Sequence, residues 1–272
     1  MDHYAVIGNP IEHSKSPLIH AAFARQTGQH MEYGRILGDP ADFAGDVRRF
    51  VAEGGRGLNV TVPFKEQAFA LLAARSERAE RAGAVNTIVV HDGGLLQGDN
   101  TDGVGLVRDL RERHGFDFQA RSVLLLGAGG AARGVLHPLL ETGLATLTIA
   151  NRTESKAVAL ADATGSSRVV GCGLDTLDER PFDLIINATS SGLGGGVPEI
   201  PPTCLCGAWA YDMLYADTPT PFCRWAAEHG AASALDGLGM LVEQAAESFY
   251  LWRGVRPDTE PVVQQLRGHG SG

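Results

Sequence analysis

The stretch RSVLLLGAGGAARGV, residues 121–135, decides how the rest of the chain is interpreted. Its apolar run from Val123 to Leu126 predicts a buried strand, and a glycine-rich turn follows directly. Beyond the turn, apolar residues three and four positions apart predict a helix: Val135, Leu136, Leu139 and Leu140. A strand, a tight glycine turn and a helix in this order can hold the phosphates of a dinucleotide.

Each small residue of the turn has a physical task in that interpretation. Gly127 permits the tight turn, and Gly129 has no Cβ atom, so the backbone can approach a pyrophosphate. Ala132 is small enough for the helix and the strand to pack closely. Free N–H groups at the start of the helix then face the anion. We therefore expect the phosphates at Gly127, Ala128, Gly129, Gly130 and Ala131.

The end of the next predicted strand, 146–150, indicates which dinucleotide binds. An NAD site usually has Asp or Glu there, whose carboxylate binds a ribose hydroxyl. This chain instead has Asn151, Arg152 and Thr153, with Lys156 one turn later. These groups suit a 2′-phosphate, so NADP is the expected cofactor. The alternative is that the two cations are merely solvated, but cations at a helix N-terminus are unfavourable without an anion.

Length and composition limit the class of protein. A chain of 272 residues can form two domains, and a net charge of −9 disfavours general nucleic-acid binding. No apolar run reaches the ~18 residues of a membrane span, and MDHYAVIGNP does not resemble a signal peptide. We therefore expect a cytoplasmic protein. Four cysteines without a C-x-x-C pair and nine histidines without ligand spacing predict no metal site.

Strands and helices alternate along the chain, which predicts an α/β fold with mostly parallel strands. In the first part we expect strands at 3–8, 30–37 and 57–60, and a hairpin over 85–98. In the second part we expect strands at 121–126, 146–150, 168–170, 183–187, 207–212 and 231–235, followed by helices at 238–253 and 260–266. A domain boundary is expected near residue 102.

Polar residues follow several predicted strands, at the edge where α/β sheets bind ligands. In HSKSP, Ser16 is either a helix N-cap or, together with Ser14, part of a carboxylate site. Asn59 and Thr61 alternate with apolar residues and should point the same way. Lys65, near the next helix start, is either a solvated lysine or a functional one.

Asp102 and Gln244 also have two interpretations each, and Glu77 has one. Asp102 in GDNTDG is either the first-turn acid of a helix or a carboxylate that shares a proton with Lys65. Gln244, in the amphipathic helix 238–253, is either a core amide or a substrate donor. Glu77 lies in the first turn of a helix that Ser76 should cap.

Taken together, these stretches resemble the shikimate dehydrogenase family from end to end and in the family's order. The stretches are IGNPIEHSKSP (7–17), LNVTVPFK (58–65), GAVNT (83–87), GDNTDG (98–103), GAGGAARG (127–134), NRT (151–153), NATSSG (187–192), YDMLY…TPF (211–222) and DGLGMLVEQAA (236–246).

The resemblance implies a fold and a reaction. An N-terminal α/β substrate domain, with a mostly parallel sheet, would comprise residues 1–102 plus 238–272. A Rossmann-type NADP domain would be inserted at 103–237, with the active site in a cleft between the domains. The implied reaction is the reversible, NADPH-linked reduction of 3-dehydroshikimate to shikimate, in chorismate and aromatic amino-acid biosynthesis. A homodimer is compatible with this interpretation.

The resemblance also implies site residues. The catalytic pair falls on Lys65 and Asp102. The substrate-binding residues fall on Ser14, Ser16, Asn59, Thr61, Lys65, Asn86, Asp102, Tyr215 and Gln244. The cofactor residues fall on positions 127–131 for the phosphates, on Asn151, Arg152, Thr153 and Lys156 for the 2′-phosphate, on Met213 and Gly237 near the nicotinamide, and on Glu77.

Two departures and two alternatives accompany the resemblance. Lys156 stands where many relatives have arginine, and it lacks the bidentate fork of a guanidinium. The loop Gly192–Gly196 is unusually rich in glycine. A broader quinate/shikimate dehydrogenase is one alternative, although Ser16 and Arg152 count against it. A non-catalytic NADP-binding sensor is the other, and it would have no use for Lys65 together with Asp102.

Overall fold

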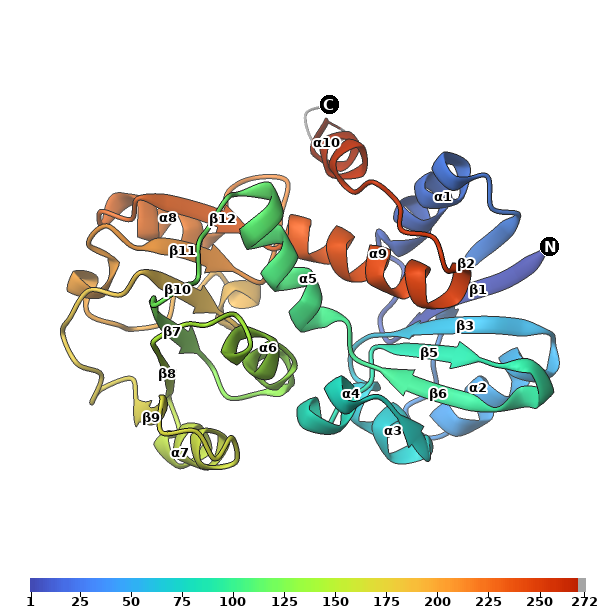
Figure 1. The fold of residues 1–272 in the computed structure, drawn as a ribbon, viewed down its shortest axis with the longest axis horizontal. Coiled ribbons are helices and arrows are strands. Elements are labelled where there is room, and N and C mark those ends of the chain that lie inside the picture. The colour runs from blue at the N-terminus through green and yellow to red at the C-terminus, as the bar shows by residue number, and fades with distance from the viewer. Residues whose placement is uncertain (269–272) are drawn as a thin grey trace. The chain divides into compact units, whose positions relative to one another are not determined.

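The computed structural model describes residues 1–268 and divides the chain into two compact units, whose elements are labelled in Figure 1. Unit 1 consists of Met1–Gly105 and Leu241–Leu266, and unit 2 of Leu106–Met240 with Arg267 and Gly268. All three boundaries fall inside helices, which are α5 (Asp102–Arg108), α9 (Leu238–Arg253) and α10 (Glu260–Gly268). Each unit is built on its own six-stranded sheet.

The sheet of unit 1 has the strand order β2-β1-β3-β5-β6-β4. Its strands are β1 (Asp2–Gly8), β2 (Met31–Leu37), β3 (Gly55–Val60), β4 (Ala74–Arg75), β5 (Thr87–Val90) and β6 (Leu96–Asp99). Strand β1 pairs in parallel with β2 and β3, and β4 with β6, whereas β5 is antiparallel to β3 and β6. The expected hairpin is therefore confirmed, and the two-residue strand β4 is the one that the sequence pattern did not predict.

Helices cover both faces of this sheet. They are α1 (Ser16–Thr27), α2 (Phe43–Ala52), α3 (Lys65–Leu71), α4 (Glu77–Ala82) and the later part of α9, and most of α10 (Glu260–Gly268) also belongs to unit 1. Leu58 and Val60 of β3 pack in one core with Phe43 of α2. On the opposite face, a Cβ atom on Gly57 would lie 2.4 Å from the indole nitrogen of Trp252 in α9. Asn59, between Leu58 and Val60, faces the α9 layer, as its hydrogen bond to Ser248 shows.

The sheet of unit 2 has the order β12-β11-β10-β7-β8-β9, and all its pairings are parallel. Its strands are β7 (Ser122–Leu126), β8 (Thr146–Asn151), β9 (Val169–Gly173), β10 (Leu184–Asn187), β11 (Trp209–Asp212) and β12 (Ser233–Asp236). The chain runs outward from β7 first on one side and then on the other, so the switch point lies between β7 and β10 (Figure 1). This is the doubly wound order of a dinucleotide-binding fold.

Alternate residues of β7 face two different cores in unit 2. Val123 and Leu125 pack with α6 (Gly130–Leu140), and Leu124 and Leu126 pack with α8 (Pro221–Glu228). Helix α7 (Glu154–Asp162) packs against β8 and β9. The fully buried apolar run predicted from the sequence is therefore confirmed, because both faces of the strand are covered.

Of the helix N-caps considered at Ser76 and Ser16, that of Ser76 is confirmed and that of Ser16 is not. Ser76 caps α4 as expected, since its hydroxyl accepts from the N–H of Ala79. The prediction that Ser16 caps α1 is wrong. Lys15 occupies that position, because its carbonyl oxygen accepts from the N–H groups of Leu18 and Ile19. Ser16 is the first helical residue and is buried, which frees its hydroxyl for another partner.

Gly127 has a backbone conformation that other residues rarely adopt. Its φ is +105°, and a Cβ atom there would lie 3.2 Å from the carbonyl oxygen of Ala188. Its own N–H donates to the carbonyl of Ala150 in the neighbouring strand. The tight turn expected from the sequence is therefore confirmed, and its geometry requires glycine.

We predict that Gly127→Ala lowers the free energy of unfolding by about 1–3 kcal/mol, because the new side chain strains the turn. Gly130→Ala is the matched control, since no atom lies within 4 Å of its would-be Cβ and it is a helix residue. The control should be as stable as the parent or slightly more so. Chemical denaturation measures both, and equal stability of the two variants would contradict the prediction.

Candidate functional site

An ion pair between Lys65 and Asp102 lies at the centre of the candidate site in unit 1. The Lys65 Nζ and Asp102 Oδ2 atoms are 2.6 Å apart. Lys65 is the first residue of α3 and Asp102 the first of α5, so two helix starts converge here. The side chains are 29% and 12% exposed, which leaves the ammonium accessible to a small molecule. A cation and a carboxylate in such contact can share and move a proton.

Backbone contacts fix the two helix starts. The carbonyl oxygen of Lys65 accepts from the N–H of Val85 at 2.9 Å. The N–H of Asp102 donates to the side-chain oxygen of Asn100 at 3.2 Å, and the Asn100 amide donates in turn to the Ala84 carbonyl at 3.0 Å. The GAVNT and GDNTDG stretches are therefore tied to each other and to α3.

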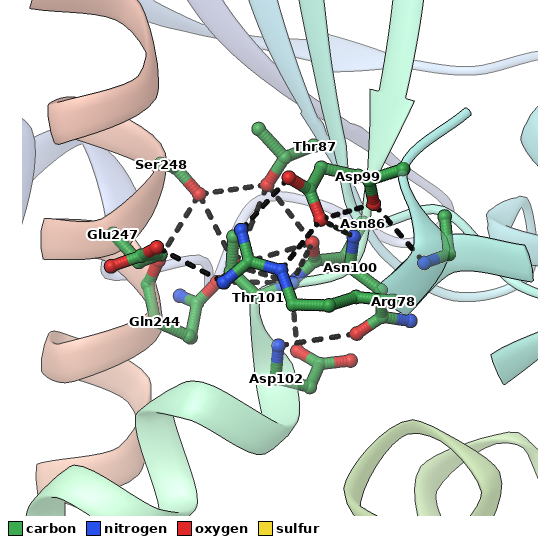
Figure 2. A network of polar contacts seen from close by, with 12 residues as sticks. Arg78, Asn86, Thr87, Asp99, Asn100, Thr101, Asp102, Gln244, Glu247 and Ser248 are labelled. Atoms are coloured by element: carbon green, nitrogen blue, oxygen red, sulfur yellow. Dashed lines mark hydrogen bonds and ion pairs between the residues drawn. The ribbon is translucent and has the colours of Figure 1, made fainter. Parts of the chain in front are cut away.

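Asn86 orients the Asp102 carboxylate. Its amide nitrogen donates to Asp102 Oδ1 at 2.9 Å and to the Thr101 hydroxyl at 2.9 Å. Its amide oxygen accepts from the Thr101 N–H and from the Thr87 hydroxyl, both at 2.9 Å. Only 2% of the Asn86 surface is exposed, and protein groups occupy most of the hydrogen-bonding capacity of its amide (Figure 2).

Asn59 is satisfied in the same way. Its amide oxygen accepts from the Tyr33 hydroxyl at 2.7 Å and from a ring nitrogen of His20 at 3.2 Å. Its amide nitrogen donates to Ser248 at 3.0 Å and lies 3.3 Å from the Thr87 hydroxyl oxygen. Thr61, two residues along, is half-buried, and its N–H donates to the carbonyl of Ile7.

Helix α9 contributes Gln244 and Ser248, one helical turn apart on the same side. Gln244 Nε2 donates to the carbonyl of Leu241 at 2.8 Å, and its oxygen accepts from Asn86 at 3.3 Å. The hydroxyl oxygens of Ser248 and Thr87 are 2.7 Å apart. Figure 2 shows these α9 side chains meeting the polar residues from β5, β6 and the start of α5.

An ionic cluster lies beside these residues. Arg78 of α4 donates two hydrogen bonds to the Asp99 carboxylate, at 3.0 and 2.8 Å, and a third to Glu247 of α9 at 3.0 Å (Figure 2). Asp99 also accepts from the Ser76 hydroxyl at 2.7 Å. The cluster joins α4, β6 and α9 around the end of the hairpin strand.

The two serines of HSKSP lie at the start of α1. The Ser16 N–H donates to the Ser14 hydroxyl oxygen at 3.3 Å, and Arg35 donates to the Ser14 carbonyl at 2.7 Å. The Tyr33 hydroxyl, on the same strand as Arg35, donates to Asn59. The loop that carries both serines is tied to the loop of Thr61 by the Asn9 N–H, which donates to the Val62 carbonyl at 3.0 Å.

His20 is fully buried on α1 and lies under the Asn59 amide. Its ring stacks on Tyr33 at a centroid distance of 4.1 Å, and its Nδ1 atom has no hydrogen-bond partner among residues 1–268. Burial lowers the pKa of His20 from 6.5 to about 3, despite the opposing hydrogen bond with Asn59. The imidazole is therefore neutral, with its proton on Nε2 facing the Asn59 oxygen.

In unit 2, the glycine turn presents free backbone groups where β7 ends. Helix α6 begins at Gly130, and its first N–H groups have no partner within the helix. Gly129, Gly130 and Ala131 are exposed, and a Cβ on either glycine would meet no atom within 4 Å. The open space over these N–H groups fits a phosphate, as the sequence predicts.

The residues expected at the 2′-phosphate lie together after β8. Asn151 donates to the Thr153 carbonyl at 2.9 Å, and Thr153 is the N-cap residue of α7. Arg152 and Lys156 are exposed, and within residues 1–268 neither forms an ion pair with a carboxylate. Two cations without a carboxylate partner at a helix start suit an added anion.

Met213 and Gly237, the expected neighbours of the nicotinamide, lie side by side. A Cβ atom on Gly237 would be 2.3 Å from the Met213 carbonyl oxygen, and the Gly237 N–H donates to the Leu214 carbonyl. The buried Asp212 carboxylate holds this segment, because it accepts from the Leu214 N–H at 3.2 Å and from the Thr220 hydroxyl at 2.6 Å.

Two other predicted residues have different surroundings. Tyr215 is half-buried, and burial raises the pKa of its hydroxyl, helped by the Asp217 charge. Glu77 is exposed on α4 in unit 1 and forms an ion pair with Arg81 one turn later. The structure gives Glu77 no feature beyond that of a first-turn acid.

Residues 1–268 contain neither a metal-binding group of side chains nor a helix that could span a membrane. The described side chains contain no group of three or more His, Cys, Asp or Glu residues that could hold a metal ion. Over the same range, none of the helices combines the length and the apolar character needed to cross a membrane.

Comparison with known proteins identifies the family. Three family models match in succession: the shikimate dehydrogenase substrate binding domain at residues 6–88, shikimate/quinate 5-dehydrogenase at 109–193, and the shikimate 5′-dehydrogenase C-terminal domain at 237–267. The NADP(+) shikimate dehydrogenase of Alkalilimnicola ehrlichii is 57% identical over 268 residues, which is 98% of both chains. The chain belongs to the shikimate dehydrogenase family.

Solved structures agree with this family. The chain is 49% identical to the Ael1 enzyme of Pseudomonas putida, with a TM-score of 0.94 over 98% of both chains. It is 33% identical to the shikimate 5-dehydrogenase of Thermus thermophilus, whose structure is a complex with NADP(H) and shikimate. That match has a TM-score of 0.86 and covers 99% of this chain and 100% of the other.

Five residues among the buried polar contacts around Asn59 and Asn86 had no predicted role in the site, although Thr101 was expected as a helix cap: His20, Tyr33, Thr87, Thr101 and Ser248. Two signals in the sequence pointed toward some of them. Ser248 follows Gln244 by four residues and therefore shares its helix face, and Thr87 and Thr101 directly follow and precede site candidates. His20 and Tyr33 gave no such signal, because only the packing of α1 on the sheet brings them to Asn59.

The buried neutral His20 predicts a pH dependence of stability. Its folded pKa of about 3 lies below its ordinary value of 6.5, so the unfolded chain binds the proton more readily. Its contribution to stability is complete above pH 6.5 and falls by about 1.4 kcal/mol per pH unit below it, down to about pH 3. Unfolding measured against pH should show a shallower acid slope for His20→Gln.

A direct readout is the ring itself. In the folded protein, the His20 NMR signals should not titrate between pH 8 and about pH 4, which lies above its folded pKa of about 3. A folded-state titration near pH 6.5 would show that the ring is not held neutral.

Proposed function

We propose that this chain catalyses the reversible, NADPH-dependent reduction of 3-dehydroshikimate to shikimate, a step toward chorismate and the aromatic amino acids. The 2.6 Å contact between Lys65 and Asp102 carries the proposal, because a ketone reduction needs a positioned proton donor. The relatives are named shikimate dehydrogenase (NADP(+)), which supports the same reaction for this chain.

The residues of unit 1 can supply what the ketone needs. When bound, NADPH supplies the hydride that reduces the C3 carbonyl carbon. Negative charge then develops on the carbonyl oxygen, and the Lys65 ammonium can stabilise that charge and donate a proton to it. Asp102 keeps Lys65 in place and can accept a hydrogen bond from a neighbouring substrate hydroxyl. In the reverse direction the same lysine takes the proton from the C3 hydroxyl.

The other end of the substrate is a carboxylate, which we assign to Ser14 and Ser16. Two hydroxyls at the start of an α-helix form a suitable carboxylate site. Thr61, Gln244 and Tyr215 are the proposed hydroxyl partners, whereas Asn59 and Asn86 have their amides largely occupied by protein groups. We therefore assign both amides a structural role, which is to hold neighbouring side chains of the site in position. Asn86 is the one that contacts Asp102 directly.

We assign the cofactor to unit 2. The phosphates would bind at residues 127–131, and the 2′-phosphate at Asn151, Arg152, Thr153 and Lys156. Met213 and Gly237 would contact the nicotinamide, and Glu77 is the weakest member of the proposed cofactor set. The substrate-binding role is likewise proposed for residues 1–102 plus 238–272, and the NADP-binding role for 103–237.

We also propose that the enzyme works in the cytoplasm, where thiols stay reduced. Its four cysteines are free thiols, which is typical of that compartment. A homodimer is part of the proposal, and light scattering at working concentration tests it. The Lys65–Asp102 contact argues against a non-catalytic sensor, and a comparison of kcat/KM for shikimate and quinate tests the broader enzyme.

Lys65→Ala should lower kcat by about 10²–10⁴-fold while the KM for NADPH changes little, because it removes the proton donor. Lys65→Arg is the matched control for charge, since a guanidinium keeps the cation but does not release a proton near neutral pH. The arginine variant should therefore stay strongly impaired. Steady-state absorbance at 340 nm measures both, and an unchanged kcat in the alanine variant would exclude Lys65 from the chemistry.

Arg152→Ala should raise the KM for NADPH and leave the use of NADH nearly unchanged, because only NADPH carries the 2′-phosphate. The expected cost is about 1.5–3 kcal/mol, which corresponds to roughly 10–100-fold in KM. Arg224→Ala, an exposed arginine on α8, is the control and should change neither value. An equal loss with both cofactors would argue against a 2′-phosphate contact.

A further inference from the structure

The polar residues buried between the sheet of unit 1 and α9 form one connected series. It runs from Tyr33 through Asn59, Ser248 and Thr87 to Asn86, and from there to the Asp102 carboxylate. The successive contacts measure 2.7, 3.0, 2.7, 2.9 and 2.9 Å. Thr87 and Ser248 are 0% exposed, so neither can contact a ligand directly.

The direction of each hydrogen bond follows from counting protons, starting at the Asp102 end. A carboxylate only accepts, so Asn86 presents its amide nitrogen to Asp102 and its amide oxygen to Thr87. If Thr87 gives its one hydroxyl proton to that oxygen, Ser248 is the donor in its 2.7 Å contact with Thr87.

The other end gives the same direction. Asn59 has its oxygen occupied by the donors Tyr33 and His20, so its amide nitrogen faces Ser248 and donates to it. Burial raises the pKa of Tyr33 well above 10.0, which keeps its phenol protonated and a donor. In this arrangement every donor in the series points toward Asp102, and aligned hydrogen bonds strengthen one another by about 10–30% each.

We propose that Thr87 and Ser248 are positioning residues. Their buried hydroxyls bridge Asn59 and Asn86 by hydrogen bonds, and the oriented Asn86 amide then holds Asp102 in contact with Lys65. The inference rests on the proposed function, because it assigns a task to residues behind the reacting pair. Its value to the enzyme is orientation: Asp102 is kept facing Lys65 before substrate arrives.

One competing arrangement exists within the same contacts. The Ser248 hydroxyl lies 3.1 Å from the carbonyl oxygen of Gln244, the usual acceptor for a serine one turn along a helix. If Ser248 donated there, Thr87 would donate to Ser248, and Asn86 would not depend on the Thr87 hydroxyl. The two arrangements therefore differ in what removal of that hydroxyl does to Asp102.

The test compares Thr87→Val with Thr87→Ser. Valine keeps the shape and removes the hydroxyl, and serine keeps the hydroxyl and removes a methyl group. We expect kcat to fall about 10-fold in the valine variant, as the loss of one hydrogen bond predicts, and to stay within about threefold in the serine variant. The KM for NADPH should stay within about twofold in both, since cofactor contacts are not changed.

Val47→Ala is the control for stability. Val47 is fully buried in the core of unit 1 and has no polar contact, so its loss destabilises the unit without touching the series. Its kcat should equal that of the parent at a temperature where both are folded. If Thr87→Val does not fold, Ser248→Ala removes the preceding donor with a smaller change of shape and should give the same selective loss of kcat.

The outcomes separate this inference from the proposed function. If the parent reduces 3-dehydroshikimate, Lys65→Ala loses the activity and Thr87→Val keeps its full kcat, the enzyme assignment stands and the inference is overturned. Equal losses in the valine and serine variants overturn it as well, because packing rather than the hydroxyl would then matter. A parent protein without any turnover removes the proposed function itself.

Discussion

The buried polar groups of unit 1 must find hydrogen-bond partners inside the protein, and this requirement shapes the candidate site. Asn59, Asn86, Thr87 and Ser248 lie in the layer where a sheet would normally pack apolar residues against α9. Each unpaired group there would cost about 1–3 kcal/mol, so the side chains are constrained to one mutually satisfied arrangement. The contact between Lys65 and Asp102 is the exposed end of that arrangement.

In unit 2 the candidate cofactor residues are positioned in a different way. Its candidate cofactor residues are mostly backbone atoms and exposed side chains at the ends of parallel strands, and few of them are held by buried polar contacts. Glycine conformation and strand order do the positioning there, as Gly127 and the switch between β7 and β10 show. Asp212 is the exception, because its buried carboxylate holds the segment after β11.

Local patterns in the sequence predicted most of the fold. The fully apolar run 123–126, the hairpin around Asp92 and the amphipathic helix 238–253 all rest on signals that lie within one element. Of the two interpretations of Ser16, the helix N-cap was wrong, because Lys15 and Ser16 are adjacent at the helix start and a local pattern does not fix the terminal residue. The meeting of Lys65 with Asp102 was expected from the family resemblance and from no local rule.

Strand β2 connects the buried series to the start of α1, because Tyr33 begins the series and Arg35 of the same strand donates to the Ser14 carbonyl. Ser14 lies at the proposed carboxylate subsite, and Asp102 lies at the proposed ketone subsite. Hydrogen bonds that fix the separation of the two subsites would select ligands by the distance between their carboxylate and their ketone. A ligand that is too short or too long could satisfy one subsite only, so discrimination among small hydroxy acids would come from spacing that the interior of the protein has already set.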